Sequence, residues 1–256
     1  MTRAPQPRTS HALPLDVPRA LRALRALAAD PDETSHVFTI IDSLSWRAPD
    51  HLVGLFHRTP EGQRLLRERP SLVPLLADRD ALRAMPEGSL AHAYLRFVES
   101  EGITADGLVE ASEKGRTGVR AGDGELEYAA QRMRDTHDLW HTVTGYQGDL
   151  LGETALLSFN VPQVWNPGIA MIVLLGMYRV RQPRVLSMVL GGFVRGLRAS
   201  YLPAIDWAPL LALPLEEVRS RLGIVPVAEY EPLRTSTLRA EGHLAPREVA
   251  AQLAMA

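Results

Sequence analysis

The chain has 256 residues, of which 46% are hydrophobic and 23% are charged, and its formal net charge is −2. This composition is that of an ordinary globular protein with a sizeable core, and the charge argues against a nucleic-acid-binding face, which needs a concentrated basic excess. Because the chain contains no cysteine, disulfides, thiolate metal ligands and a cysteine nucleophile are excluded, and any metal must be held by imidazole, carboxylate, carbonyl or water.

The N-terminal stretch, MTRAPQPRTSHALPLDVPRA, does not match a targeting segment. It lacks the apolar core of a secretory signal, and its prolines disfavour the amphipathic helix of an organelle transit peptide. We therefore expect residues 1–15 to form a flexible tail and the protein to be cytoplasmic.

The longest apolar run extends from Gly168 to Tyr178 and is shorter than the roughly 18–20 residues that span a bilayer. It indicates either a buried core helix or a helix that faces a lipid or a membrane surface. Any contact with a membrane is therefore expected to be peripheral, at the inner membrane face.

From residue 16 onward the pattern is helical, and neither alternating apolar runs nor Asn-Gly hairpin signals indicate a strand. The first predicted helix spans residues 18–31, with Asp16 placed to cap its N-terminus. Leu21, Leu24 and Ala28 share its predicted apolar side. Further helices are predicted at residues 33–45, 59–69, 86–102, 125–145, 149–160, 166–181, 183–203 and 214–223.

Turn-forming residues separate several of these helices. Residues 115–124 contain four glycines and predict the clearest loop, and the helix at 149–160 is expected to end before Pro162. The sequence therefore predicts an all-α protein with one mainly helical domain over residues 16–228. Residues 229–256 are expected to form a C-terminal extension, either an appended helix or an oligomer contact.

The segment HDLWHTVTGYQGDLLGE, residues 137–153, carries the strongest chemical signal. His137 and His141 are four residues apart, so on a helix both imidazoles can point to one place. The turn-forming stretch 144–149 lets a second helix return Glu153 to the pair. Two histidines and a carboxylate leave room for water or substrate, which is the pattern of an open catalytic metal site.

The roles of the neighbouring acids stay open from spacing alone. Asp138 can bind the metal directly, orient a ligand, or act as a base on bound water. Asp149 is expected to cap the second helix rather than to bind a metal. The segment is not HExxH, so the metalloprotease mechanism does not transfer to it.

Two other interpretations of the histidine pair compete with a metal site of this kind. Pairs with this spacing also occur by chance on solvated helix faces. An HD-type phosphohydrolase would need a further histidine upstream and an aspartate downstream. His92 and Asp206 are available for those places, although their spacing lends no support.

HDxxH followed by eleven residues and a glutamate resembles the signature of the Coq4 family of ubiquinone-biosynthesis proteins. His137, Asp138, His141 and Glu153 match it without a gap. Three flanking stretches are also similar to the family, and together the resemblance covers roughly residues 35–226. These stretches are RMRDTHDLWH before the motif, MPEGSLAHAYLRF from Met85, and DWAPLLALPLEEVRSRLGI from Asp206.

The resemblance implies an all-α fold, a groove for long isoprenoid lipids, and a divalent metal, usually taken as Zn²⁺, on the four motif residues. It also implies an enzyme that removes the C1 carboxylate of a polyprenyl-hydroxybenzoate ring and places a hydroxyl there, with Asp138 as the catalytic residue. A lipid-binding scaffold for quinone-biosynthesis enzymes is the alternative, as is an enzyme recruited to another aromatic substrate in secondary metabolism. The expected partners are a prenylated aromatic lipid, quinone-biosynthesis enzymes and a second copy of the chain.

Overall fold

The computed structural model describes residues 12–102, 124–179 and 183–240. Within these ranges the chain forms α-helices and two short 3-10 helices, and no strand. The predicted all-α fold class is therefore confirmed. Outside the described residues lie most of the predicted tail (1–11), nearly all of the predicted glycine-rich loop (115–123) and the end of the C-terminal extension (241–256).

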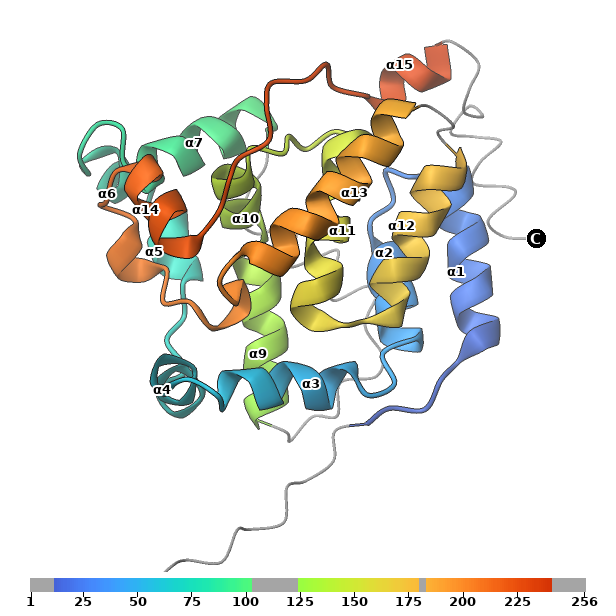
Figure 1. Cartoon of the computed structure of the whole chain (residues 1–256), viewed down its shortest axis with the longest axis horizontal. Coiled ribbons are helices and arrows are strands. Elements are labelled where there is room, and N and C mark those ends of the chain that lie inside the picture. The colour runs from blue at the N-terminus through green and yellow to red at the C-terminus, as the bar shows by residue number, and fades with distance from the viewer. Residues whose placement is uncertain (1–11, 103–123, 180–182, 241–256) are drawn as a thin grey trace, which may run out of the picture.

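Most of the described helices follow one another with short connections (Figure 1). In chain order they are α1 (Val17–Ala29), α2 (Ser35–Ser43), α3 (Ala48–Phe56), α4 (Pro60–Glu68), α5 (Val73–Ala77), α6 (Arg79–Arg83), α7 (Leu90–Ser100), α9 (Gly124–Asp135), α10 (His137–Thr144), α11 (Leu150–Val164), α12 (Pro167–Arg179), α13 (Pro183–Arg198), η1 (Leu202–Ala204), η2 (Ala208–Leu210), α14 (Leu215–Leu222) and α15 (Thr235–Ala240).

Helix α11 is the centre of the packing, with α13 and α12 against it and α10 joined to its start (Figure 1). Its close approach to α13 depends on Gly192 and Gly196. A Cβ atom at either glycine would overlap a carbonyl oxygen of α11, at Ala155 or Phe159. Small residues at a helix crossing let two backbones come together, so the glycine-containing segment is a helix despite its low propensity.

The buried side of α1 differs from the predicted one. Ala20, Ala23 and Leu27 are buried, whereas Leu21 is 52% exposed. The alanines face inward because α1 packs tightly along α2, where a small side chain permits close contact. The predicted cap is confirmed, since Asp16 accepts a hydrogen bond from the backbone N–H of Arg19.

Several predicted helix ends were wrong, and two of them lie close to the motif. The segment 125–145 is not one helix, because it breaks at Thr136, whose hydroxyl donates to the carbonyl of Arg132 and not forward into α10. Helix α11 does not end before Pro162 but continues through it to Val164. A proline lacks one backbone donor, and so near the end of a helix it removes a single hydrogen bond from the last turn.

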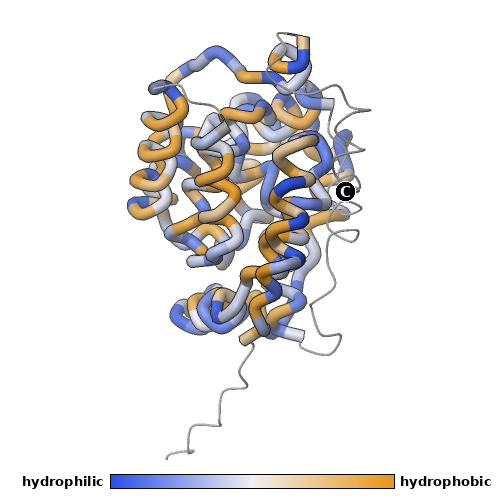
Figure 2. Tube along the Cα trace, turned by 90° about the vertical axis from the view of Figure 1, so that its right-hand side faces the viewer, coloured by the Kyte–Doolittle hydropathy of each residue, from blue (hydrophilic) through white to orange (hydrophobic). Residues whose placement is uncertain are grey.

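Helix α12, which contains the longest apolar run, is neither wholly buried nor wholly exposed. Ile172 and Val173 are buried, whereas Leu174 and Tyr178 are 58% and 66% exposed. Figure 2 shows hydrophobic residues along most of the helices, interleaved with hydrophilic ones. Among the described residues, no helix has the length and apolar character that crossing a membrane requires.

After α14 the chain runs back over the junction of α10 and α11, and α15 is the last described element (Figure 1). We call residues 226–240 the C-terminal strap. Its backbone is tied to that junction at two points: Val227 N–H donates to the carbonyl of Thr144, and Leu150 N–H donates to the carbonyl of Leu233. The first part of the predicted extension is therefore bound to the helical domain.

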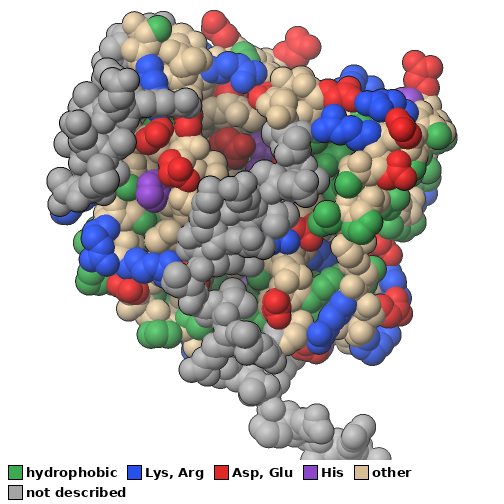
Figure 3. Space-filling view, turned by 180° about the vertical axis from the view of Figure 1, so that it is seen from behind, with side chains coloured by type: hydrophobic (Ala, Val, Ile, Leu, Met, Phe, Trp, Pro, Cys, Tyr) green, Lys and Arg blue, Asp and Glu red, His purple; other side chains and the backbone are tan. Residues whose placement is uncertain are grey.

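A cavity of about 840 Å³ lies among α1, α2, α11, α12 and the strap. Most of its lining side chains are apolar. Figure 3 shows a hollow on the rear face of the molecule with acidic and histidine side chains inside it. His137 and Glu153 line this cavity, so two of the four predicted metal ligands stand at its wall.

Candidate metal centre

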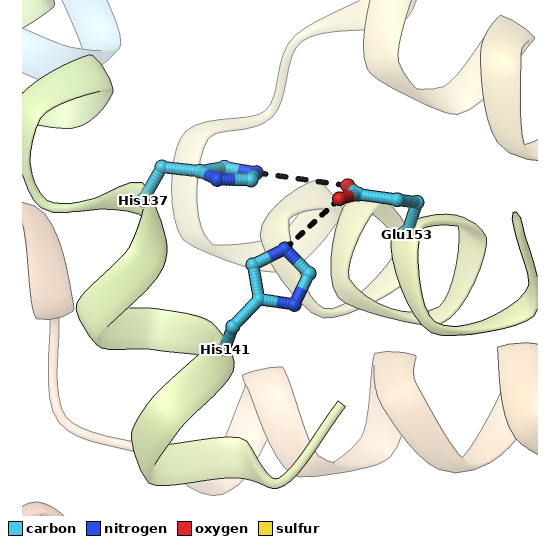
Figure 4. A group of neighbouring side chains, drawn as sticks. All are labelled: His137, His141 and Glu153. Atoms are coloured by element: carbon cyan, nitrogen blue, oxygen red, sulfur yellow. Dashed lines mark ion pairs between the residues drawn. The ribbon is translucent and has the colours of Figure 1, made fainter. Parts of the chain in front are cut away.

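The turn between α10 and α11 brings the motif together as the sequence predicts. Helix α10 ends at Gly145, which adopts the left-handed conformation (φ 79°) that favours glycine. Asp149 then caps α11, accepting a hydrogen bond from the N–H of Leu151. Glu153 therefore lies in the first turn of α11 and faces His137 and His141 on α10 (Figure 4).

The end of α10 is held from outside by residues distant in sequence. Arg219 of α14 donates from Nε to the carbonyl of Val143 at 2.9 Å and from a terminal nitrogen to that of Thr142 at 3.3 Å. The strap satisfies the next carbonyl, that of Thr144. These bonds occupy acceptors that a helix end leaves unpaired, and they fix α10 where its histidines meet Glu153.

Three donor atoms converge in the site. His141 Nε2 lies 3.2 Å from Glu153 Oε1, and His137 Nε2 lies 3.7 Å from Glu153 Oε2 (Figure 4). One ligand atom from each residue lies within 4.8 Å of those of the other two. Bond lengths of about 2.0–2.2 Å to a divalent ion fit such a triangle after a small adjustment.

The other nitrogen of each imidazole is already engaged, and this sets the tautomer. His141 Nδ1 lies 3.0 Å from the carbonyl oxygen of Tyr146 and must donate its proton there, because a carbonyl only accepts. His137 Nδ1 lies 3.2 Å from Asp138 Oδ1 and donates in the same way. Both Nε2 atoms therefore present a lone pair toward Glu153.

The buried Nε2 atom of His141 makes no hydrogen bond, although Glu153 lies beside it. Two nitrogen lone pairs and a carboxylate that face one point repel one another unless they share a cation. Metal-binding histidines commonly donate the second N–H to a carboxylate or a backbone carbonyl, as both do here. The residues present thus fit a divalent metal ion.

The electrostatics of the three side chains reflect this arrangement. Burial disfavours the charged form of Glu153, but the positive charges that His141 and His137 carry when protonated outweigh this effect and lower the pKa of Glu153 to about 2. Burial acts to lower the pKa of His137, but the hydrogen bond with Asp138 and the charge of Glu153 raise it above its ordinary value. The carboxylate is therefore ionised and ready to bind a cation at neutral pH.

Asp138 stands behind the group and not within it. Its carboxylate contacts His137 Nδ1, on the ring side away from Glu153. Tyr94 of α7 lies near enough to feel this carboxylate. Its burial and the charge of Asp138 together raise the pKa of Tyr94 to about 12. Of the three roles open from the sequence, this geometry matches the orientation of His137.

The residues proposed for a phosphohydrolase do not join the site. The ring of His92 contacts the carbonyl of Arg83 through Nε2, and Asp206 forms an ion pair with Arg64 beyond α9. Among the described residues, neither belongs to the group of ligand atoms around Glu153. The HD-type phosphohydrolase interpretation is therefore set aside.

Sequence reasoning missed the aromatic wall of the site. Phe97 of α7 stacks on the ring of His141, with 4.9 Å between centroids and 15° between planes. It holds the imidazole in one orientation and keeps water from one side. Phe97 lies in the helix predicted at residues 86–102, but nothing in that local sequence indicates that its ring contacts His141.

Comparison with known families matches residues 16–228 to the family model described as "Coenzyme Q (ubiquinone) biosynthesis protein Coq4". The chain is 30% identical over 180 residues to the mitochondrial ubiquinone biosynthesis protein COQ4 of Podospora anserina, which covers 69% of this chain and 57% of that one. It is 32% identical over 178 residues to the mitochondrial COQ4 homolog of Rattus norvegicus, covering 68% of this chain and 64% of the relative.

The match to a solved structure extends over most of the fold. A crystal structure from Nostoc punctiforme PCC 73102 at 2.85 Å resolution, described as a candidate ubiquinone biosynthesis protein, superposes with a TM-score of 0.60. The two chains are 26% identical, and the match covers 82% of this chain and 98% of that one. Fold, family model and curated relatives thus agree, and the chain belongs to the Coq4 family.

Proposed function

We propose that this protein acts in ubiquinone biosynthesis as a metal-dependent enzyme, replacing the C1 carboxylate of a polyprenyl-hydroxybenzoate ring with a hydroxyl. The observation that carries the proposal is the convergence of His137, His141 and Glu153, of which His137 and Glu153 line a mainly apolar cavity. His137, His141 and Glu153 hold one divalent ion, for which Zn²⁺ is the first expectation.

The chemistry divides between the ion and the chain. When bound, a divalent ion supplies a Lewis acid for a ring carboxylate or phenolate oxygen. The conversion breaks the bond from the ring to the carboxylate and releases carbon dioxide. The ring carbon forms a bond to the oxygen of a water molecule, which loses one proton, and an external oxidant such as dioxygen takes up two electrons. Asp138 holds the proton on His137 Nδ1 and so keeps Nε2 directed at the site.

The cavity offers both a charged and an apolar surface to a prenylated ring. Arg134 lines it, paired with Asp135 at 2.8 Å, and is the cation that a ring carboxylate would meet there. The apolar side chains of α1, α2 and α12 offer a surface to a prenyl tail, since each buried methylene contributes about 0.8 kcal/mol. Three ligands beside such a cavity leave coordination positions open, which supports an enzyme over a scaffold that presents lipid to partner enzymes.

Partners and location belong to the same proposal. The curated relatives are named as mitochondrial, and this chain spans about 57% and 64% of their lengths, so the cytoplasmic location expected from the sequence stays a prediction. Contact with quinone-biosynthesis enzymes, self-association and peripheral attachment to the inner membrane face are proposed alongside it.

The role of Asp138 can be tested by Asp138→Asn, which keeps the size of the side chain but removes its charge. Product formation is expected to fall about 10–100-fold, the usual effect of losing a partner behind a metal ligand, while binding of a prenylated ring is retained. The measurement is quinone production in a strain that lacks the C1 step, together with accumulation of the C1-carboxylated intermediate.

The matched control is Asp80→Asn, in which a largely exposed aspartate loses its ion pair with Arg83. It should leave quinone production unchanged. Normal quinone production by a folded variant that binds no metal would end the enzymatic proposal. Failure of the unaltered protein to restore quinone production would point instead to an aromatic substrate of secondary metabolism.

Metal binding is expected to weaken as the pH falls, because each imidazole must release its proton before Nε2 can bind an ion. The pKa of His137 is raised above the ordinary 6.5. The affinity for the metal is therefore at its full value above that raised pKa and is lost as the pH falls through it. Zinc titration against a competing chelator at several pH values measures the midpoint. In Asp138→Asn the midpoint should move to lower pH, and a shift to higher pH would contradict the assigned contact.

A further inference from the structure

Most of the C-terminal strap, residues 229–240, lies beyond residue 228, where the match to the family model ends, yet it reaches the site. The hydroxyl of Tyr230 donates to Asp149 Oδ2 at 2.7 Å and accepts from the N–H of Gln147 at 2.9 Å. The N–H of Leu233 donates to Asp149 Oδ1 at 2.8 Å. The start of the strap is thus fixed on the turn that places Glu153.

The far end of the strap is tied to the opposite side of the cavity by charge. Arg239 of α15 pairs with Asp30 at 2.5 Å and with Asp32 at 3.2 Å, in the turn that follows α1. The hydroxyl of Thr235 donates to Asp32 at 2.6 Å. Arg239 is only 14% exposed, so these pairs are better shielded than ordinary surface pairs and hold α15 in one position.

Between these two attachments the strap faces the cavity. Leu238 lines it and is 7% exposed, packed in a cluster with Val173 of α12 and Val185 and Val189 of α13. Leu175 and Gly176 of α12 line the same cavity. The strap residues that line the cavity are Arg234, Thr235, Ser236 and Leu238.

We propose that the strap forms a wall of the binding pocket, and that Leu238 determines which tails the pocket accepts. The ligand class, a hydroxybenzoate ring with an isoprenoid tail, rests on the proposed function. The ring lies by His137 and Glu153, and the tail follows the apolar side chains that extend from there to α12 and α15. The charge pairs of Arg239 fix Leu238 in place, so the size of this side chain limits the room for the tail.

The test uses the full chain and a series of probes: 4-hydroxybenzoate alone, and the same ring carrying one, two or three isoprene units. Affinity for the unaltered protein is expected to rise with tail length. Leu238→Trp should weaken binding of the longest probe by about tenfold, because overpacking a buried site is costly, while 4-hydroxybenzoate binds as before. Zinc affinity should also stay unchanged.

Leu197→Trp is the matched control, since Leu197 is 57% exposed on α13 and does not line the cavity. It should leave the dependence on tail length as it is. Should Leu238→Trp not fold, Leu238→Ala gives the opposite change, widening the wall and shifting preference toward longer tails.

The outcomes separate the two proposals. If the unaltered protein prefers longer tails and the Leu238 variants keep the same preference, the proposal that Leu238 forms a wall of the pocket is wrong, whereas the proposed ligand class is supported. An unaltered protein that binds every probe equally would overturn both, because no tail pocket would then exist. A selective loss for long tails in Leu238→Trp supports both.

Discussion

His141→Ala is expected to abolish metal binding. The unaltered protein should carry about one divalent ion per chain, and loss of one of three converging ligands should weaken binding by far more than the 10–100-fold that follows removal of a residue behind a ligand. Elemental analysis of the purified protein measures both the stoichiometry and the identity of the ion, which matters because two histidines and a carboxylate also suit iron(II).

The control for this prediction is His92→Ala, which removes an imidazole of α7 that contacts the backbone carbonyl of Arg83 on α6. It should retain the full metal content. The assignment fails if His137→Ala and Glu153→Ala both keep the metal, since a site that needs neither residue is not the one described. Circular dichroism of each variant shows whether α10 and α11 are still folded.

Asp149→Ala is expected to cost about 3–5 kcal/mol of the free energy of unfolding, because three donors lose a charged acceptor in a buried place. Asp149 is 2% exposed and accepts from the N–H groups of Leu151 and Leu233 and from the hydroxyl of Tyr230. The measurement is urea unfolding followed by circular dichroism, with the free energy extrapolated to water.

Two comparisons make this value interpretable. Tyr230→Phe removes one of the three donors and should cost about 1–2 kcal/mol. Asp78→Ala removes an exposed helix cap, which accepts from the N–H of Ala81, and should cost about 1 kcal/mol. If Asp149→Ala costs no more than Asp78→Ala, the strap contributes nothing through Asp149.

Local features of the fold and of the site could be predicted from the sequence because their causes lie within a few residues. The caps at Asp16 and Asp149 follow from residue type beside a periodic apolar pattern. The convergence of His137, His141 and Glu153 follows from one helical turn, a glycine stop and a second helix start. Each of these features is encoded within a short stretch of sequence, so neighbouring residues were enough to predict it.

Features that depend on distant partners left no local signal. Leu21 has a larger side chain than the alanines of α1 and is nevertheless exposed. The alanine side of α1 packs against α2 because small side chains let the two helices come close together. From the sequence, Phe97 is predicted only to be a core residue. Its contact with His141 becomes apparent only once α10 packs against α7. The strap is polar and proline-containing, and its attachment to Asp149 spans 81 and 84 residues, which no local pattern encodes.

That long span has a consequence for the order of events during synthesis. The helices bearing the histidines and Glu153 emerge from the ribosome while Tyr230 and Leu233, the partners of Asp149, are still to be translated. Domains generally begin to fold from the N-terminal side as the chain grows. The nascent protein therefore passes through a stage in which the Leu151 N–H is available to the Asp149 carboxylate but its two donors from the strap are not, so the turn before Glu153 gains these contacts only after residues 230–233 have been made.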